Sequence, residues 1–165
     1  MSDGHFYVEG LRLLTPETFW FMVRAELRRA VRAQTFLTLV VLEAKREWDE
    51  MLMTADDGTV AELGQLIGRE IRDTDLVSRT DPGMLSVALL DTDLDSSRAV
   101  IDRFVARLDN YEFATPLLVA VGAACYPTHA VDAESLHREA VSRPLVRRRA
   151  GGGDRVFSTG RRQTS

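Results

Sequence analysis

The fold of this chain is most constrained by a predicted β-hairpin over residues 76–90. The tripeptide Asp81-Pro82-Gly83 is flanked by the stretch 76–80, which begins with Leu76-Val77, and by the mainly apolar stretch 84–90. Proline presets one backbone angle of a tight turn and glycine accepts a positive φ angle, so this tripeptide suits a chain reversal. The hairpin therefore requires a sheet in which two sequential strands are antiparallel neighbours.

Apolar patterns on either side of the hairpin predict the other elements. The runs 36–43 and 117–124 are almost wholly apolar, as strands buried on both faces usually are. Apolar residues at helical spacing predict helices over 16–33, 59–72 and 95–109, and a fourth helix that Asp132 caps.

The middle of the chain thus has the order strand, helix, strand, strand, helix, strand. This order is that of the ferredoxin-like βαββαβ unit, so we predict an α+β fold: an antiparallel sheet with helices on one face, and extra N- and C-terminal helices. Right-handed crossovers place strands 36–43 and 84–91 side by side in the sheet centre. Glu43, at the end of the first strand, then faces the turn at 81–83.

A single domain accounts for nearly the whole chain. Segment 14–158 contains every predicted element, with residues 44–57 as a polar connection and 154–158 as an edge strand. Residues 1–13 are a short lead-in, and the tail 159–165 is expected to be disordered. The length of 165 residues, 45% of them hydrophobic, suits one core and is too short for two.

Charge and composition argue against several classes of function. The net charge of −4 does not favour nucleic acid or an anionic membrane, and the arginines within 143–149 are typical of a solvated end. No apolar run nears the ~18 residues of a membrane span, and no signal peptide is recognisable. The single cysteine, Cys125, suits a reducing compartment, and the scattered histidines form no zinc-ligand pattern. We therefore expect a cytoplasmic protein without a metal site.

Three segments resemble, in order and spacing, the diguanylate cyclase or GGDEF domain, and the resemblance covers residues 14–158. They are Asp75-Leu76-Val77-Ser78-Arg79, Val121-Gly122-Ala123-Ala124-Cys125-Tyr126-Pro127, and Glu134-Ser135-Leu136-His137-Arg138-Glu139-Ala140 followed by 152–156. Pro144 departs from the pattern, because it interrupts the last helix of the family. The resemblance implies a nucleotide-cyclase type of fold in the bacterial cytoplasm. Active members make cyclic di-GMP from two GTP molecules with magnesium.

The catalytic positions implied by this resemblance carry the wrong residues. The first acidic position is Glu43, the second is Lys45, the Phe-Lys pair is Glu47-Trp48, and the guanine-binding asparagine is Met51. The signature itself reads Asp81-Pro82-Gly83-Met84-Leu85 in place of Gly-Gly-Asp/Glu-Glu-Phe. Phosphoryl transfer needs hard oxygen ligands and close backbone approach to the nucleotide. We therefore predict a degenerate domain without cyclase activity, in which Glu43, Trp48, Asp81, Pro82 and Gly83 are vestigial.

The family's product-inhibition motif, Arg-x-x-Asp five residues before the signature, survives as Arg72 and Asp75. The resemblance implies that these residues bind cyclic di-GMP, since a guanidinium can bind phosphate or guanine and a carboxylate can accept from guanine. The alternative is local structure alone: Arg72 in the last turn of a helix, Asp75 at the start of a strand, and a surface pair between them.

Two functions are consistent with these residues. The first is a catalytically inactive regulatory domain that binds cyclic di-GMP through Arg72 and Asp75, with no other cofactor. The second is a nucleotide-independent scaffold that binds a signalling protein through the vacated face around Glu43, Trp48 and the 81–83 turn. The apolar block 19–22 adds a candidate protein-binding or dimer surface.

Overall fold

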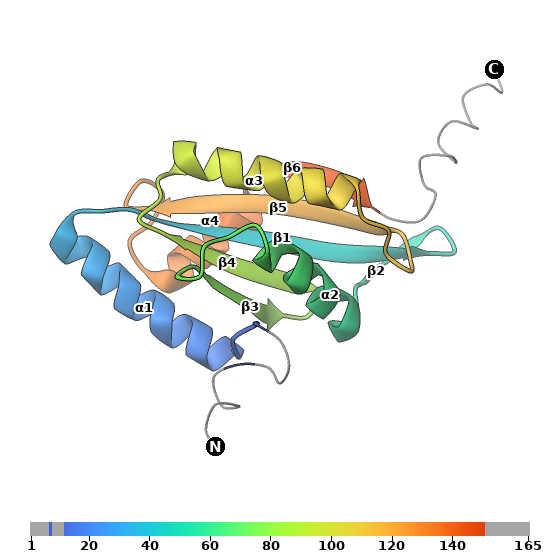
Figure 1. The fold of residues 1–165 in the computed structure, drawn as a ribbon, viewed down its shortest axis with the longest axis horizontal. Coiled ribbons are helices and arrows are strands. Elements are labelled where there is room, and N and C mark those ends of the chain that lie inside the picture. Colours follow the sequence, from blue (N-terminus) through green and yellow to red (C-terminus); the bar gives the residue numbers. More distant parts are fainter. Residues whose placement is uncertain (1–6, 8–11, 151–165) are drawn as a thin grey trace.

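The computed structural model describes Tyr7 and residues 12–150, and the elements predicted within these residues occur in the expected order, with β2 and β6 as strands that were not predicted (Figure 1). They are α1 (Pro16–Ala33), β1 (Leu37–Trp48), β2 (Met51–Thr54), α2 (Asp57–Gly68), β3 (Leu76–Asp81), β4 (Met84–Leu90), α3 (Leu94–Asp109), β5 (Leu117–Tyr126), α4 (Ala133–Ser142) and β6 (Pro144–Ala150). Most of the lead-in, the strand predicted at 154–158 and the tail lie outside the described residues. None of the described helices is long and apolar enough to cross a membrane.

The described strands form one antiparallel sheet in the order β3-β4-β1-β5-β6, with β2 pairing with the far part of β1. The predicted hairpin is confirmed, and β4 lies beside β1 with Val40 opposite Val87. Glu43 is paired with Met84, and the backbone N–H of Ala44 donates to the carbonyl of Gly83 at 2.7 Å. The end of the predicted first strand therefore does face the turn.

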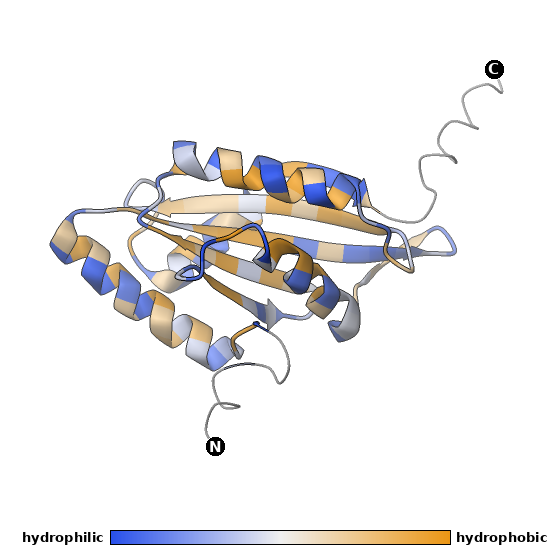
Figure 2. Cartoon of the chain, viewed as in Figure 1, coloured by the Kyte–Doolittle hydropathy of each residue, from blue (hydrophilic) through white to orange (hydrophobic). Residues whose placement is uncertain are grey.

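Helices cover both faces of the sheet, which corrects the prediction of one covered face. On one face α2 and α3 pack on the strands through Ile67 and Phe104, among others. On the opposite face α1 and α4 do so, with Phe19 and Leu136 buried. Both faces of the central strands are accordingly apolar, and Figure 2 shows this colouring along the sheet. Alternate side chains of a strand point to opposite faces, so one continuous apolar run can supply two cores.

Helix α2 begins and ends earlier than predicted. Asp56 accepts the backbone N–H of Thr59 and caps the helix, which ends at Gly68, so Arg72 lies outside it. The side chains of Arg12 and Asp75, which are far apart in the sequence, account for the place where the helix ends. Arg12 donates to the carbonyl of Gly68 at 2.9 Å, and the N–H of Arg72 donates to Asp75 instead of continuing the helix.

The prediction that residues 44–57 form a polar connection is wrong. Strand β1 continues to Trp48, turns at Asp49 and Glu50, and returns as β2. We call residues 45–54 the arm, because this two-stranded ribbon extends beyond the β3–β4 turn (Figure 1). Its charged residues Lys45, Arg46 and Glu47 obscured a strand that is not buried on both faces.

The edge of the sheet beyond β5 is formed by β6, which pairs Val146 with Val121 and Ala150 with Leu117. Pro144 does not lie in a helix: α4 ends at Ser142, and Pro144 is the first residue of the strand. A proline is acceptable at the start of an edge strand because its missing N–H is not needed there.

Candidate functional site

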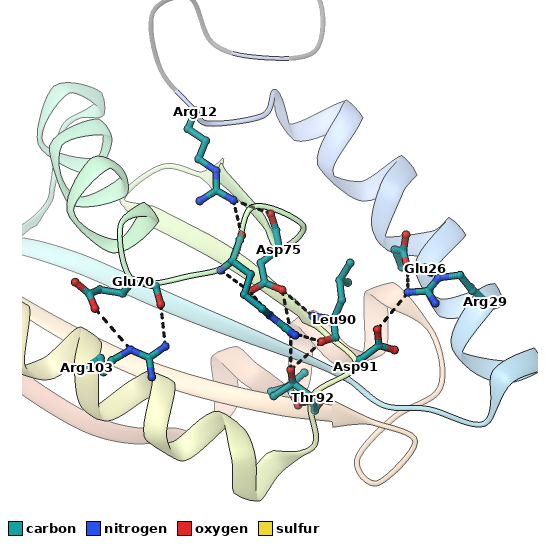
Figure 3. Close-up of polar contacts among 11 residues, drawn as sticks. Arg12, Glu26, Arg29, Glu70, Asp75, Leu90, Asp91, Thr92 and Arg103 are labelled. Carbon is teal, nitrogen blue, oxygen red and sulfur yellow. Dashed lines mark hydrogen bonds and ion pairs between the residues drawn. The ribbon is translucent and has the colours of Figure 1, made fainter.

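Asp75 lies immediately before β3 and is buried, with 5% of its surface exposed. One carboxylate oxygen accepts the backbone N–H of Leu90 at 3.1 Å, and the other accepts the backbone N–H of Arg72 at 3.0 Å. These bonds hold the start of β3 against the end of β4 and fix the loop after α2 (Figure 3). The carboxylate of Asp75 is therefore engaged by the fold.

The guanidinium of Arg72 is held at the same place but remains open to solvent. It donates to the carbonyl of Leu90, to Thr92 Oγ1 at 3.0 Å, and to Asp75 Oδ1 at 3.4 Å. Its side chain is nevertheless 58% exposed. The structure thus brings Arg72 and Asp75 together as predicted, with different roles: Asp75 orients the guanidinium, and Arg72 presents it to solvent.

Two cavities meet at this motif. One, of about 430 Å³, is lined by Arg12 and Arg29 as well as Arg72 and Asp75. The other, of about 390 Å³, is lined by Arg103 together with Arg72, Asp75 and Thr92. A ligand on the exposed face of Arg72 can therefore reach further guanidinium groups from three other segments.

Sequence reasoning missed these additional arginines, because none of them is close to Arg72 along the chain. Arg12 donates to the carbonyls of Arg72 and Asp75 at 2.7 and 3.2 Å. Arg103 donates to the carbonyl of Glu70 at 2.9 Å (Figure 3). These contacts join residues 60, 63 and 33 positions apart, and no local pattern signals them.

Nearby carboxylates partly neutralise the positive charge of these arginines. Glu26 and Asp91 face Arg29, and the hydrogen bond that Arg29 donates to Glu26 raises the pKa of the guanidinium above its ordinary value. Glu70 pairs with Arg103 and Arg107. The site is therefore an array of charge-assisted hydrogen-bond donors with nearby acceptors, and it is not a bare cationic patch.

At the β3–β4 turn, the backbone is covered by the residues where the arm joins the sheet, Ala44 and Thr54. Gly83 has a φ angle of +71°, and a Cβ there would lie 2.6 Å from Thr54 Cγ2 and 3.1 Å from the carbonyl of Ala44. The chain itself therefore packs against this glycine and leaves no room for a side chain there.

The two acidic residues near the turn, Glu43 and Asp81, lie in different surroundings. Glu43 lines a small cavity with Ala140 and Arg147, whereas Asp81 lies 3.4 Å from His137 Nε2 on α4. In the part of the chain that the structure describes, no three His, Cys, Asp or Glu side chains are grouped so as to hold a metal ion. The residues present do not fit the pair of magnesium ions that diguanylate synthesis requires.

Trp48 is not part of this turn. It lies at the end of β1, five residues beyond Glu43, is 61% exposed, and has Arg46 over its ring at 6.0 Å from the centroid. Because Trp48 lies on the arm, its side chain is away from Glu43 and does not cover that position. The predicted vestigial residues are thus divided between the turn and the arm.

His137 links α4 to the turn and to α1. Its ring contacts the edge of Trp20, with centroids 5.2 Å apart, and its Nε2 faces Asp81. Burial lowers the pKa of His137 from its ordinary value, and the carboxylate of Asp81 opposes part of this effect. The imidazole is therefore held mainly in its neutral form at neutral pH.

The same fold occurs in solved GGDEF domains. A GGDEF domain from Pseudomonas aeruginosa (TpbB or YfiN) has a TM-score of 0.66 at 19% identity, covering 82% of this chain and 84% of its own. A DGC protein from Thermotoga maritima has a TM-score of 0.68 at 13% identity over 81% and 97% of the two chains.

A third structure, the GGDEF domain of DgcB from Caulobacter crescentus in complex with c-di-GMP, has a TM-score of 0.62 at 11% identity over 83% and 86%. No family model matches the sequence, and no curated protein matches it. The class that the structure defines is therefore a domain with the GGDEF fold, which confirms the predicted fold class.

Proposed function

We propose that this domain is a regulatory domain that does not synthesise cyclic di-GMP. The observation that carries the proposal is the closed turn at Gly83, where Thr54 and Ala44 occupy the space next to the glycine backbone. Diguanylate synthesis needs close backbone approach at the two glycines of the signature together with carboxylates that hold magnesium. Here Asp81 and Pro82 stand at the glycine positions, Gly83 and Met84 stand at the acidic positions, and Asp81 faces His137.

The ligand we propose is cyclic di-GMP, bound at Arg72. Support comes from the exposed guanidinium, from its place between two cavities, and from the arginines that line them. A guanidinium fork binds phosphate or the acceptor edge of guanine with two parallel hydrogen bonds. Asp75 then positions Arg72 through its buried hydrogen bonds, and it does not contact the ligand directly.

Calorimetric titration of cyclic di-GMP into the protein at about 100 µM tests this proposal. We expect binding that Arg72→Ala weakens about ten- to hundredfold, the effect of losing a hydrogen bond to a charged group. Arg98→Ala is the matched control, because Arg98 is an exposed arginine on α3 that lines neither cavity. Absence of binding would refute the receptor function, and GTP turnover with Mg²⁺ would refute the inactive state.

A second candidate is a protein-binding scaffold that uses no nucleotide. It is favoured by the exposed apolar side chains of the arm: Trp48, Met51, Leu52 and Met53. Its partner would be a signalling or regulatory protein in the cytoplasm. Binding of such a partner that survives Arg72→Ala and is lost on Trp48→Ala would favour the scaffold over the receptor.

A further inference from the structure

The arm presents an apolar face that the described part of the chain does not cover. The cross-strand pairs Trp48–Met51 and Arg46–Met53 place these four side chains on one face. Met51 is 63% exposed, a value similar to that of Trp48. Tryptophan, methionine and arginine are the residues enriched at protein interfaces, so the composition of this face is that of a contact surface.

The tip of the arm has an unfavourable backbone. Asp49 and Glu50 have φ angles of 52° and 65°, as a two-residue turn with positive φ at both positions requires. Such turns favour Asn-Gly or Asp-Gly, and glutamate has no side-chain feature that suits the left-handed region. The acidic pair therefore places two negative charges at the end of the arm.

A cavity that matches the arm lies between α1 and α4. It has a volume of about 800 Å³, and Trp20, Met84 and Val141 provide its apolar lining. No residue of the arm lines it, so the arm does not fill it within one chain.

The charged residues of this cavity leave one cation without a salt bridge. Arg24 pairs with Glu134 at 2.9 Å, and Asp81 faces His137. Arg138 donates to Ser135 Oγ at 3.2 Å and interacts electrostatically with Asp132 and Glu139, but it forms no salt bridge with any residue in the described ranges. An acidic group entering the cavity would therefore find its counter-charge in Arg138.

We propose that two copies of this chain associate by reciprocal insertion of the arm into the α1–α4 cavity. Trp48 and Met51 of one copy pack on the apolar lining of the other, and the acidic tip pairs with Arg138. Met84 of the cavity is paired with Glu43, two residues before the arm begins, so arm and cavity adjoin the same end of the sheet. Two identical contacts related by a two-fold axis close the assembly as a dimer.

Sedimentation velocity of the full chain over a range of concentrations tests the association. We expect a dimer whose dissociation constant rises at least about tenfold in Trp48→Ser and in Val141→Asp, since each removes the apolar contact from one side. Phe21→Ser is the control, because Phe21 is 67% exposed on α1 but does not line the cavity. A wild-type protein that stays monomeric would overturn the proposal.

A charge exchange tests the pairing itself. The double variant D49R/E50R and the single variant Arg138→Glu should each be monomeric, because each homodimer would oppose like charges in both contacts. Mixed together they should form a heterodimer, since its two contacts both join opposite charges. Recovery on mixing supports the reciprocal arrangement. No recovery, or a dimer that is lost in arm variants and kept in Val141→Asp and Arg138→Glu, would overturn it.

Discussion

The buried carboxylate of Asp75 accepts the backbone N–H of Leu90 at 3.1 Å, which joins the start of β3 to the last residue of β4. The same carboxylate fixes the backbone and the guanidinium of Arg72. The Arg72–Asp75 motif, which resembles a ligand site, therefore also holds the two ends of the hairpin together. Substitutions at its two positions should have different consequences.

Asp75→Ala should lower the free energy of unfolding by about 2–4 kcal/mol, because it leaves buried N–H groups without acceptors. Arg72→Ala should cost clearly less, since its guanidinium is more than half exposed. Urea denaturation of the two variants measures the difference. Equal losses in both variants would contradict the assignment of Asp75 as the buried member of the pair.

Gly83→Ala should destabilise the domain by more than about 1 kcal/mol, because the residue has positive φ and a Cβ would meet Thr54. Gly58→Ala is the control: its nearest neighbour to a Cβ is Asp56 Oδ1 at 3.8 Å, so little change is expected. Thr54→Ser removes the Cγ2 atom and should recover part of the loss in the double variant. If Gly83→Ala were neutral in thermal unfolding, the turn would not be closed as described.

Much of the fold could be predicted because it depends on local patterns. The hairpin, the cap of α4 by Asp132 and the pairing of β1 with β4 follow from turn residues, periodicity and the handedness of crossovers. The arm could not be predicted in the same way. Its first strand begins with three charged residues and its second strand is exposed throughout, so no apolar alternation marks either strand as part of the sheet.

The proximity of Arg72 and Asp75 could be predicted from the sequence, but their surroundings could not. The spacing of Arg72 and Asp75 suggested a pair, whereas burial of Asp75 depends on Leu90, 15 residues away. The contribution of Arg12 depends on a segment 60 residues from Arg72. Contacts of this kind arise from the packing of elements, which a single sequence does not specify locally.

His137 should make stability depend on pH in a defined direction. Its pKa is lowered in the folded state, so the stabilisation is complete above its ordinary value of 6.5 and is lost as pH falls through the lower folded value. The urea midpoint of wild type relative to His137→Gln should therefore decrease between about pH 7 and pH 5. Asp81, Arg24, Glu134 and Arg138 line the same cavity, and Asp81→Asn should enlarge the decrease by removing the opposing charge. If the urea midpoint of wild type instead rose relative to that of His137→Gln on acidification, the inference that folding lowers the pKa of His137 would be wrong.

Tyr111 should ionise at a pH above the ordinary value of 10.0. Its hydroxyl donates to the carboxylate of Glu62 on α2, and this hydrogen bond, together with burial, raises the pKa of the phenol. The raised pKa favours the neutral phenol in the folded state, so its stabilisation is present below the ordinary value of 10.0 and is lost as pH rises through the folded value. Ultraviolet titration of wild type and Tyr111→Phe should show that the variant lacks an ionisation step above pH 10.0 that the wild type has. Glu62→Gln should lower that step toward the ordinary value, and a step unchanged by this substitution would exclude Glu62 as its cause.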